Sequence, residues 1–200
     1  MKKLTILMLI TAFLFPSCDS KTERKTTGTP PTQEGIAKDS SYTETNKGIS
    51  NSETDLLARL PVRDLPIMDS TSFDNFEKYG IRDNGFLKRI KFDPRRKEAN
   101  NFRLNYKIPL SENFTSVVIS YQCGEHELFT TLITINKDNK IIDKLEIAYD
   151  EIAESAFGKT SKIEKDKIMV TSSNWMSEVP VFETETYILE YNGKFKKIKS

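Results

Sequence analysis

After Asn101 the apolar residues recur at every second position of the chain. In the segment FRLNYKI, residues 102–108, each aromatic or aliphatic residue alternates with a basic or amide residue. Successive side chains of a β-strand point to opposite sides, so this pattern predicts a strand with one buried and one solvated face. The residues expected on the buried face are Phe102, Leu104, Tyr106 and Ile108.

Strand-length segments of the same kind continue toward the end of the chain and are separated by short turns. The further predicted strands are residues 114–122, 127–135, 140–149, 160–164, 167–173, 184–191 and 194–199. The last two are joined by Asn192-Gly193, which favours a type I′ hairpin turn because that turn needs positive backbone angles. The final strand, KFKKIK, is predicted to lie at a sheet edge, where its lysines discourage pairing with another sheet.

Seven or eight short strands in hairpin succession predict one antiparallel β-meander domain, shaped as a barrel or a sandwich. One face of each strand is expected to be solvated, which argues against a parallel α/β sheet. The fold class is therefore mainly β, with an α+β margin because short helices are predicted ahead of the strands.

Two short helices are predicted before the sheet, over residues 52–61 and 83–92. The first, SETDLLARLP, has Ser52 or Thr54 as a candidate N-cap and ends before Pro61. Residues 62–80 are rich in turn residues and are expected to be irregular. Residues 149–159 fit either a short helix or a loop.

The first seventeen residues have the layout of a secretory signal peptide. Lys2 and Lys3 give a positive start, and Leu4 to Phe15 is apolar except for two threonines. This apolar run is shorter than the about 20 residues that a membrane-spanning helix needs. Residues 1–17 are therefore interpreted as a signal peptide.

The sequence Phe15-Pro16-Ser17-Cys18 resembles the lipobox of bacterial lipoproteins, in which a small residue precedes a cysteine that is acylated and becomes the new N-terminus. The resemblance implies lipid attachment at Cys18. Acyl chains there hold a protein to a membrane, since each buried methylene contributes about 0.8 kcal/mol. It also implies a cell-envelope location, with the outer membrane favoured, on its periplasmic side or at the cell surface. In layout alone, the chain is similar to small β-rich envelope lipoproteins.

Residues 18–55 are rich in Ser, Thr, Lys, Glu, Gly and Pro. Such a composition buries too little apolar surface to offset the entropy of ordering, so a disordered linker is predicted, with a root-mean-square span of about 30–35 Å. Residues 56–200 form the predicted β-rich globular domain. The formal net charge of +1 gives no reason to expect a nucleic acid partner.

The only histidine, His126, lies near Cys123 in the segment QCGEHE. A zinc site needs four protein ligands, or three and a water, and the sequence has no second histidine to complete one. With Cys18 attached to lipid, Cys123 has no intrachain partner for a disulfide. We therefore expect a tight hairpin turn at Gly124 with a solvated His126, and we expect no metal site, cofactor or catalytic residue.

Two other features are candidate binding surfaces. The segment LKRIKFDPRRK, residues 87–97, carries six basic residues, a density that suits the phosphate groups of anionic headgroups. The alternative is a solvated helix end that needs no partner. Trp175, beside Met176 in a predicted loop, and His126 are further candidates. The basic candidates are Lys88, Arg89, Lys91, Arg95, Arg96 and Lys97.

These features favour a lipid-anchored envelope protein that acts as a non-enzymatic binding or assembly module. Its partners are the membrane, through the acyl chains, and another envelope protein or anionic headgroups. The first alternative is a β-barrel carrier of a small apolar ligand or lipid. The second is a hydrolase that uses His126 or the carboxylates, which is disfavoured because the sequence contains no catalytic motif.

Overall fold

A computed structural model describes residues 52–152 and 156–198 of the chain. The predictions on the signal peptide, on Cys18 and on residues 18–51 lie outside the described residues. The first helix begins at Ser52, slightly ahead of the predicted domain start at residue 56. Leu56 and Leu60 are both buried and lie one helical turn apart, so the helix needs residues before Leu56 to complete its first turn.

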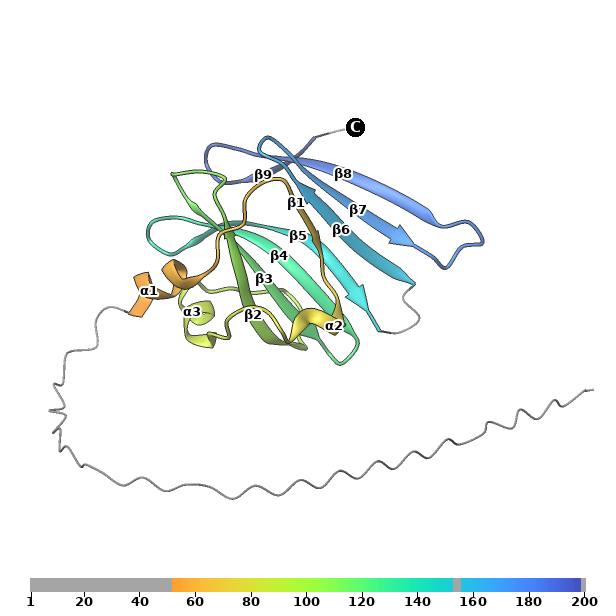
Figure 1. Cartoon of the computed structure of the whole chain (residues 1–200), viewed down its shortest axis with the longest axis horizontal. Coiled ribbons are helices and arrows are strands. Elements are labelled where there is room, and N and C mark those ends of the chain that lie inside the picture. Colours follow the sequence, from red (N-terminus) through yellow and green to blue (C-terminus); the bar gives the residue numbers. More distant parts are fainter. Residues whose placement is uncertain (1–51, 153–155, 199–200) are drawn as a thin grey trace, which may run out of the picture. The chain divides into compact units, whose positions relative to one another are not determined.

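The described residues form short helices and nine β-strands (Figure 1). In chain order the elements are α1 (Ser52–Arg59), β1 (Ile67–Ser70), α2 (Phe73–Phe76), α3 (Asn84–Arg89), β2 (Ala99–Ile108), β3 (Thr115–Cys123), β4 (Glu127–Ile135), β5 (Ile141–Glu151), β6 (Phe157–Ile163), β7 (Ile168–Asn174), β8 (Val181–Leu189) and β9 (Phe195–Ile198). The strands that the alternating pattern predicted are confirmed, and residues 149–151 and 157–159, whose state was open, belong to β5 and β6.

All nine strands belong to one antiparallel sheet in which β2 to β9 follow one another as neighbours. This confirms the mainly β meander, and the sheet is open rather than closed into a barrel. Strands β5 and β6 are paired only at Tyr149 and Lys159. Beyond that point β1 pairs with β6 instead, from Ile67 opposite Ile163 to Ser70 opposite Thr160. The sheet is therefore split between β5 and β6, and β1 fills the split.

Strand β1 and helix α2 lie inside residues 62–80, which were predicted to be irregular, so that prediction is wrong. The strand has only four residues, of which Ile67 and Asp69 are buried and Met68 and Ser70 are exposed. This alternation covers only four residues, with a proline before it and turn residues after it, so it gives no clear strand signal in the sequence. The strand exists because β6, far along the chain, supplies its hydrogen-bonding partners.

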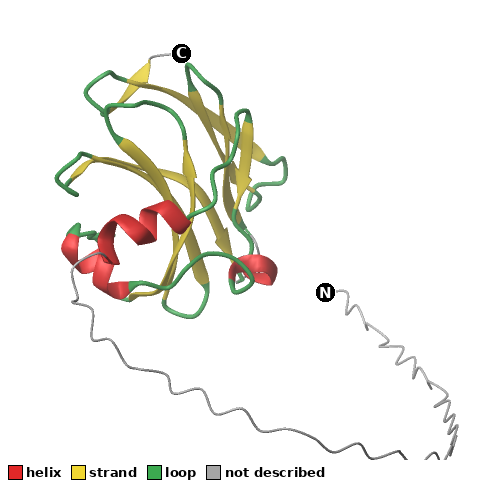
Figure 2. Cartoon of the chain, turned by 60° about the vertical axis from the view of Figure 1, so that its left-hand side comes forward, coloured by secondary structure: helices red, strands yellow, loops and turns green. Residues whose placement is uncertain are grey.

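The protein has two apolar clusters, one on each face of β3 and β4. One cluster packs α1 and α3 against β2, β3 and β4, and Figure 2 shows these helices against one side of the strands. The other cluster contains residues of all the strands from β1 through β7. Every residue from Ser116 to Tyr121 and from Leu128 to Ile135 is consequently buried. The prediction that each strand keeps one solvated face is therefore wrong for β3 and β4.

A β-bulge in β2 also changes the predicted face of several side chains. Leu104 pairs with Ile119, whereas Tyr106 pairs with Val118, so two steps on β2 match one step on β3. The extra residue, Asn105, rotates the strand, because a one-residue shift moves side chains to the opposite face. Leu104 thus packs under the helices, while Tyr106 joins the other cluster. The prediction of one shared buried face for Phe102, Leu104, Tyr106 and Ile108 is wrong.

The hairpin between β8 and β9 is present, but its turn is not type I′. Gly193 has a φ of 85° and Asn192 is not among the described residues with positive φ. The amide of Gly193 donates to the carbonyl of Glu190, and the amide of Glu190 donates to the carbonyl of Lys194, at 2.9 Å each. This is a three-residue loop in which a glycine follows a type I turn. Strand β9 lies at the sheet edge, as predicted.

Candidate functional site

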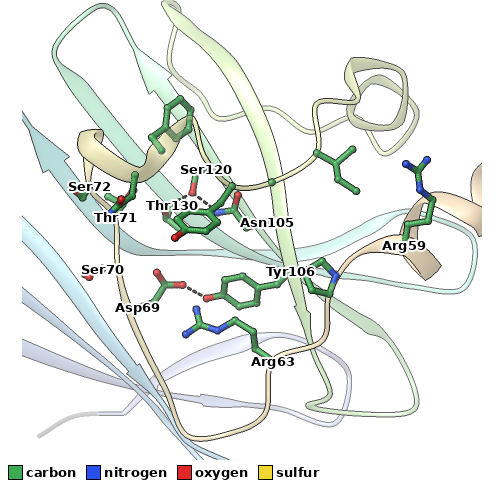
Figure 3. A pocket seen from close by; sticks show the side chains of 16 residues that line it. Arg59, Arg63, Asp69, Ser70, Thr71, Ser72, Asn105, Tyr106, Ser120 and Thr130 are labelled. Carbon is green, nitrogen blue, oxygen red and sulfur yellow. Dashed lines mark hydrogen bonds between the residues drawn. The ribbon is translucent and has the colours of Figure 1, made fainter. Parts of the chain in front are cut away.

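A pocket of about 780 Å³ lies between the segment that connects α1 to β2 and the face of the sheet opposite the one that α1 and α3 cover. Its outer wall comes from the end of α1, from β1 and from α2. Its floor comes from β2, β3 and β4 (Figure 3). The β1–α2 segment is attached to the sheet at two places. Strand β1 pairs with β6, and the Phe73 amide donates a 3.2 Å hydrogen bond to Asp150 Oδ2 of β5. The pocket lies between this segment and strands β2, β3 and β4.

The floor of the pocket is a chain of hydrogen-bonded polar side chains. Asn105 Nδ2 donates to Ser120 Oγ at 2.7 Å, and Ser120 Oγ lies 2.6 Å from Thr130 Oγ1. Whichever hydroxyl donates in the second bond, the other keeps a hydrogen that no hydrogen bond among the described residues uses. Both hydroxyl residues are buried. The floor therefore presents one hydrogen-bond donor to whatever occupies the pocket.

The β1 side of the pocket carries a buried carboxylate. Asp69 is 8% exposed, and its carboxylate accepts a hydrogen bond from the hydroxyl of Tyr106. The guanidinium carbon of Arg63 lies 4.6 Å from the centre of the Tyr106 ring, and Figure 3 shows Arg63 pointing toward Asp69. Burial raises the pKa of Asp69, while the hydrogen bond from Tyr106 and the charge of Arg63 oppose that rise.

Burial also raises the pKa of Tyr106, and the neighbouring carboxylate of Asp69 raises it further. The phenol therefore stays protonated and acts as a fixed donor to Asp69. Arg59, at the end of α1, adds a second guanidinium to the same pocket. Figure 3 shows Arg59 on the side of the pocket away from Asp69 and Arg63, so the lining as a whole carries two guanidinium groups and one carboxylate.

Gly80 brings the chain into close contact with the pocket floor. Its φ is 82°, and a Cβ atom there would lie 2.6 Å from Oδ1 of Asn105 and 2.9 Å from Cβ of Arg103. Only glycine fits both this conformation and this spacing. The exposed side chain of Tyr79 precedes it at the pocket edge, and its carbonyl accepts a 3.2 Å hydrogen bond from Arg103 Nη1.

Taken together, the pocket offers two guanidinium groups, a donor at its floor and three aromatic rings from Phe76, Tyr79 and Tyr106. Guanidinium groups recognise carboxylates and phosphates through paired hydrogen bonds. The arrangement can therefore bind a small molecule that has an anionic group. Within residues 52–152 and 156–198, no three or more His, Cys, Asp or Glu side chains are grouped so as to hold a metal ion.

No family model matches the chain, and no curated protein or solved structure shows significant similarity to it. In the part of the chain that the structure describes, no helix has the length and apolar character needed to cross a membrane.

The structure distributes the six basic candidates of residues 87–97 over several surroundings. Lys88 and Lys91 line a second depression, of about 490 Å³, together with Arg82. The guanidinium carbon of Arg89 lies 5.8 Å from the ring centre of Phe86. Arg95 and Lys97 are exposed. None of the six lines the pocket beside Asp69.

Arg96 belongs to the packing of the sheet instead. Its guanidinium carbon lies 3.7 Å from the ring centre of Phe129, and its Nη2 donates to Glu146 Oε2 at 3.0 Å. Glu146 also pairs with Lys159 of β6. Arg96 therefore links the loop after α3 to β4 and β5, a structural role that the sequence did not indicate.

His126 and Trp175 lie apart from the pocket. His126 is exposed in the β3–β4 turn, next to Gly124, whose φ is 61°. Cys123 is partly buried, and desolvation raises the pKa of its thiol, which keeps the thiol in its unreactive protonated form. Trp175 is exposed in the loop between β7 and β8, as predicted, and its ring contacts that of Phe182.

Sequence reasoning missed the residues that line the pocket. Asp69 was assigned to an irregular segment, and Tyr106 to the apolar core alone. A usable signal was present in the strands: Ser120 and Thr130 place hydroxyl groups inside otherwise apolar segments, VVISY and ELFTTLITI. A buried hydroxyl requires a partner, so such positions mark the places where polar groups converge.

Proposed function

We propose that the protein is a lipid-anchored, non-enzymatic binding module of a bacterial cell envelope, and that its pocket holds a small molecule with a carboxylate group. The observation that carries the proposal is the pocket itself, whose floor offers a hydroxyl donor and whose walls carry the guanidinium groups of Arg63 and Arg59. A volume of about 780 Å³ falls within the range of sites that bind small molecules, about 300–1,000 Å³.

The charge distribution supports an anionic group in the ligand, because the lining carries two arginines, Arg59 and Arg63, and one carboxylate, Asp69. Arg63 lies over the ring of Tyr106 and is attracted by the charge of Asp69, and Tyr106 in turn donates a hydrogen bond to Asp69. A positioned guanidinium loses less side-chain freedom when it binds a carboxylate than a free one does. The body of the ligand then lies against the rings of Phe76 and Tyr79, with a polar group at the Ser120–Thr130 floor.

The other functions suggested by the sequence remain predictions with less support. An apolar carrier requires an enclosed apolar interior, whereas the sheet is open and the pocket floor is polar. A hydrolase that uses His126 has less support because this side chain is exposed in a turn away from the pocket.

The test is a binding titration of the full-length chain in detergent micelles, followed by saturation-transfer NMR. The probes are 4-hydroxybenzoate and glucuronate, each compared with a neutral counterpart, 4-hydroxybenzamide or glucose. We expect at least one acid to bind and its neutral counterpart to bind more weakly. Arg63→Gln should weaken binding of the acid by about tenfold, because a charge-assisted hydrogen bond contributes roughly 1.5–3 kcal/mol.

The matched control is Arg82→Gln, which makes the same chemical change at an exposed arginine outside this pocket. It should leave the affinity unchanged. Ser120→Val should weaken the acid and its neutral counterpart alike, because it removes a hydroxyl from the floor. Binding of neither acid, or equal loss in the two arginine variants, would contradict the proposal.

The anchor is tested separately by mass spectrometry of the protein purified from its native membrane. We expect a chain that begins at Cys18 and carries acyl chains on that residue. A Cys18→Ser variant should leave the membrane fraction, since it lacks the atom that bears the lipid. An unmodified thiol at Cys18 in the native protein would refute the anchor and leave the pocket open to its own test.

A further inference from the structure

The end of the β7–β8 hairpin is the most apolar exposed part of the described residues. Four large apolar side chains lie there within eight consecutive residues, and more than half of each is exposed. They are Trp175 (54%), Met176 (64%), Val179 (74%) and Phe182 (57%). The rings of Trp175 and Phe182 contact each other edge to face, with centres 5.4 Å apart. A contiguous exposed patch of this kind marks an interaction site, whereas single exposed apolar residues do not.

The apolar side chains surround the hairpin end instead of covering one face. Val181 pairs with Asn174 and Phe182 pairs with Ser173, so Val181 and Phe182 point to opposite sides of the hairpin. On the Val181 side, Phe157 of β6 pairs with the same Asn174, and both apolar residues are exposed. On the other side the ring of Trp175 contacts that of Phe182 edge to face. Figure 1 shows the loop of this hairpin extending beyond the ends of β5 and β6.

The charges that the hairpin itself carries are all negative. From Ile168 to Gly193 the chain contains four glutamates and no lysine or arginine. Two of these glutamates, Glu178 and Glu183, flank the apolar residues and are exposed. The hairpin itself therefore supplies no cation for anionic lipid headgroups, and the nearby cations beside Phe157, Arg96 and Lys159, are both paired with Glu146.

We infer that the β7–β8 hairpin end inserts into the headgroup region of a zwitterionic lipid bilayer and orients the domain on the membrane. Tryptophan and phenylalanine favour this region because it accepts apolar rings while water still reaches polar groups. A bilayer surrounds whatever enters it, so it suits a hairpin end that is apolar on both sides. The surface is distinct from the pocket. The inference rests on the proposed function in one respect only: the lipid anchor keeps the hairpin close to a bilayer.

A second copy of the chain is a poorer occupant. Strand β8 pairs with β9 only from Thr186 to Leu189, so the apolar end of β8 is the part available for pairing with another chain. Antiparallel pairing of two such ends centred on Glu183 would place the two glutamates opposite each other. Like charges directly across a strand pair are destabilising.

The test uses Trp175 as its reporter, because it is the only tryptophan of the chain. The full-length chain is reconstituted into phosphatidylcholine vesicles whose acyl chains carry bromine, which quenches tryptophan emission on contact. We expect the emission of Trp175 to shift to shorter wavelength and to be quenched. Phe182→Thr and Val179→Asp should each reduce the quenched fraction by about half or more, because they remove apolar contact with the lipid.

The matched control is Tyr191→Thr, at an aromatic residue that is 85% exposed in the β8–β9 turn; it should leave the quenching unchanged. Addition of phosphatidylglycerol should not increase the quenching. Unquenched emission from the reconstituted protein would overturn the inference. Quenching that requires anionic lipid, or a blue shift that depends on protein concentration without vesicles, would overturn it too. Circular dichroism checks that both variants remain folded, and mass spectrometry of the same sample reads the anchor independently.

Discussion

Replacement of Leu132 by alanine is expected to lower the free energy of unfolding by about 2–5 kcal/mol, the range for a leucine removed from a packed core. Leu132 lies in β4 and is fully buried in the cluster that joins the two halves of the sheet. Its neighbour Ile133 is equally buried but belongs to the cluster under the helices. Consecutive residues of one strand thus support both clusters, and Ile133→Ala is expected to cost a similar amount.

Urea unfolding of the full-length chain, followed by circular dichroism, measures both effects. Because β4 belongs to both clusters, each variant should show one transition that is shifted as a whole to lower urea concentration. Met68→Ala is the control: this apolar side chain of β1 is exposed, so the change is expected to stay within about 0.5 kcal/mol. Two separate transitions would contradict the prediction that β4 supports both clusters. A decrease of less than about 1 kcal/mol in the free energy of unfolding of Leu132→Ala would contradict it too.

The strands could be predicted from the sequence because their apolar period is local. A segment such as ELFTTLITI contains enough β-branched and aromatic residues to identify β4 without knowledge of its neighbours. Strand β1 could not be found in this way. Its four residues form a strand because β6 pairs with them across a large distance in the chain, and no local pattern carries that information.

The faces of the strands were harder to predict than the strands themselves. Asn105 inserts one residue into β2, and a similar shift near Ile147 lies between β4 and β5. Each shift moves the following side chains to the other face. In β2 this shift brings Tyr106 to Asp69, and in β5 it brings Tyr149 against the ring of Phe129. Bulges depend on twist and packing across the whole sheet, so the sequence alone did not reveal them.

The candidate pocket was missed for the same reason. Its side chains come from β1, α2 and the segment after it, from β2, β3 and β4 and from the end of α1. They meet through the β1–β6 pairing and the bulge at Asn105. The basic run at residues 87–97 was visible in the sequence, yet Arg96 turns toward Glu146 and Phe129. A run of charges reports composition, whereas a site depends on which side chains the fold brings together.

Tyr106→Phe is expected to lower the free energy of unfolding by about 1–3 kcal/mol at neutral pH, the cost of leaving a buried polar group without its partner. Asp69 would remain buried but would lose the hydrogen bond from the phenol. Its pKa, already raised by burial, would rise further. The loss should shrink as the pH falls, because protonation of Asp69 removes the unpaired charge.

The pH dependence of the free energy of unfolding of the wild-type protein gives an independent measure of the same carboxylate. A raised native pKa means that the folded protein binds the proton of Asp69 more tightly than the unfolded chain does. This contribution to stability is therefore greatest below the ordinary aspartate pKa, declines as the pH rises through the raised pKa and is lost above it. Asp69→Asn should remove this decline and leave the protein at least as stable at neutral pH. The neutral amide still accepts the hydrogen bond from Tyr106 but carries no buried charge.

These variants connect stability with the proposed function. A buried carboxylate that reduces stability at neutral pH is explained if it positions Arg63 for an anionic ligand, because binding sites commonly give up stability for activity. Asp69→Asn is therefore expected to bind 4-hydroxybenzoate or glucuronate more weakly although the protein is no less stable. Urea unfolding between pH 4 and pH 8 and the NMR titration measure the two properties on the same samples. If Asp69→Asn unfolds more readily than the wild type at neutral pH and binds the acids equally well, the carboxylate serves the fold and has no role in the pocket.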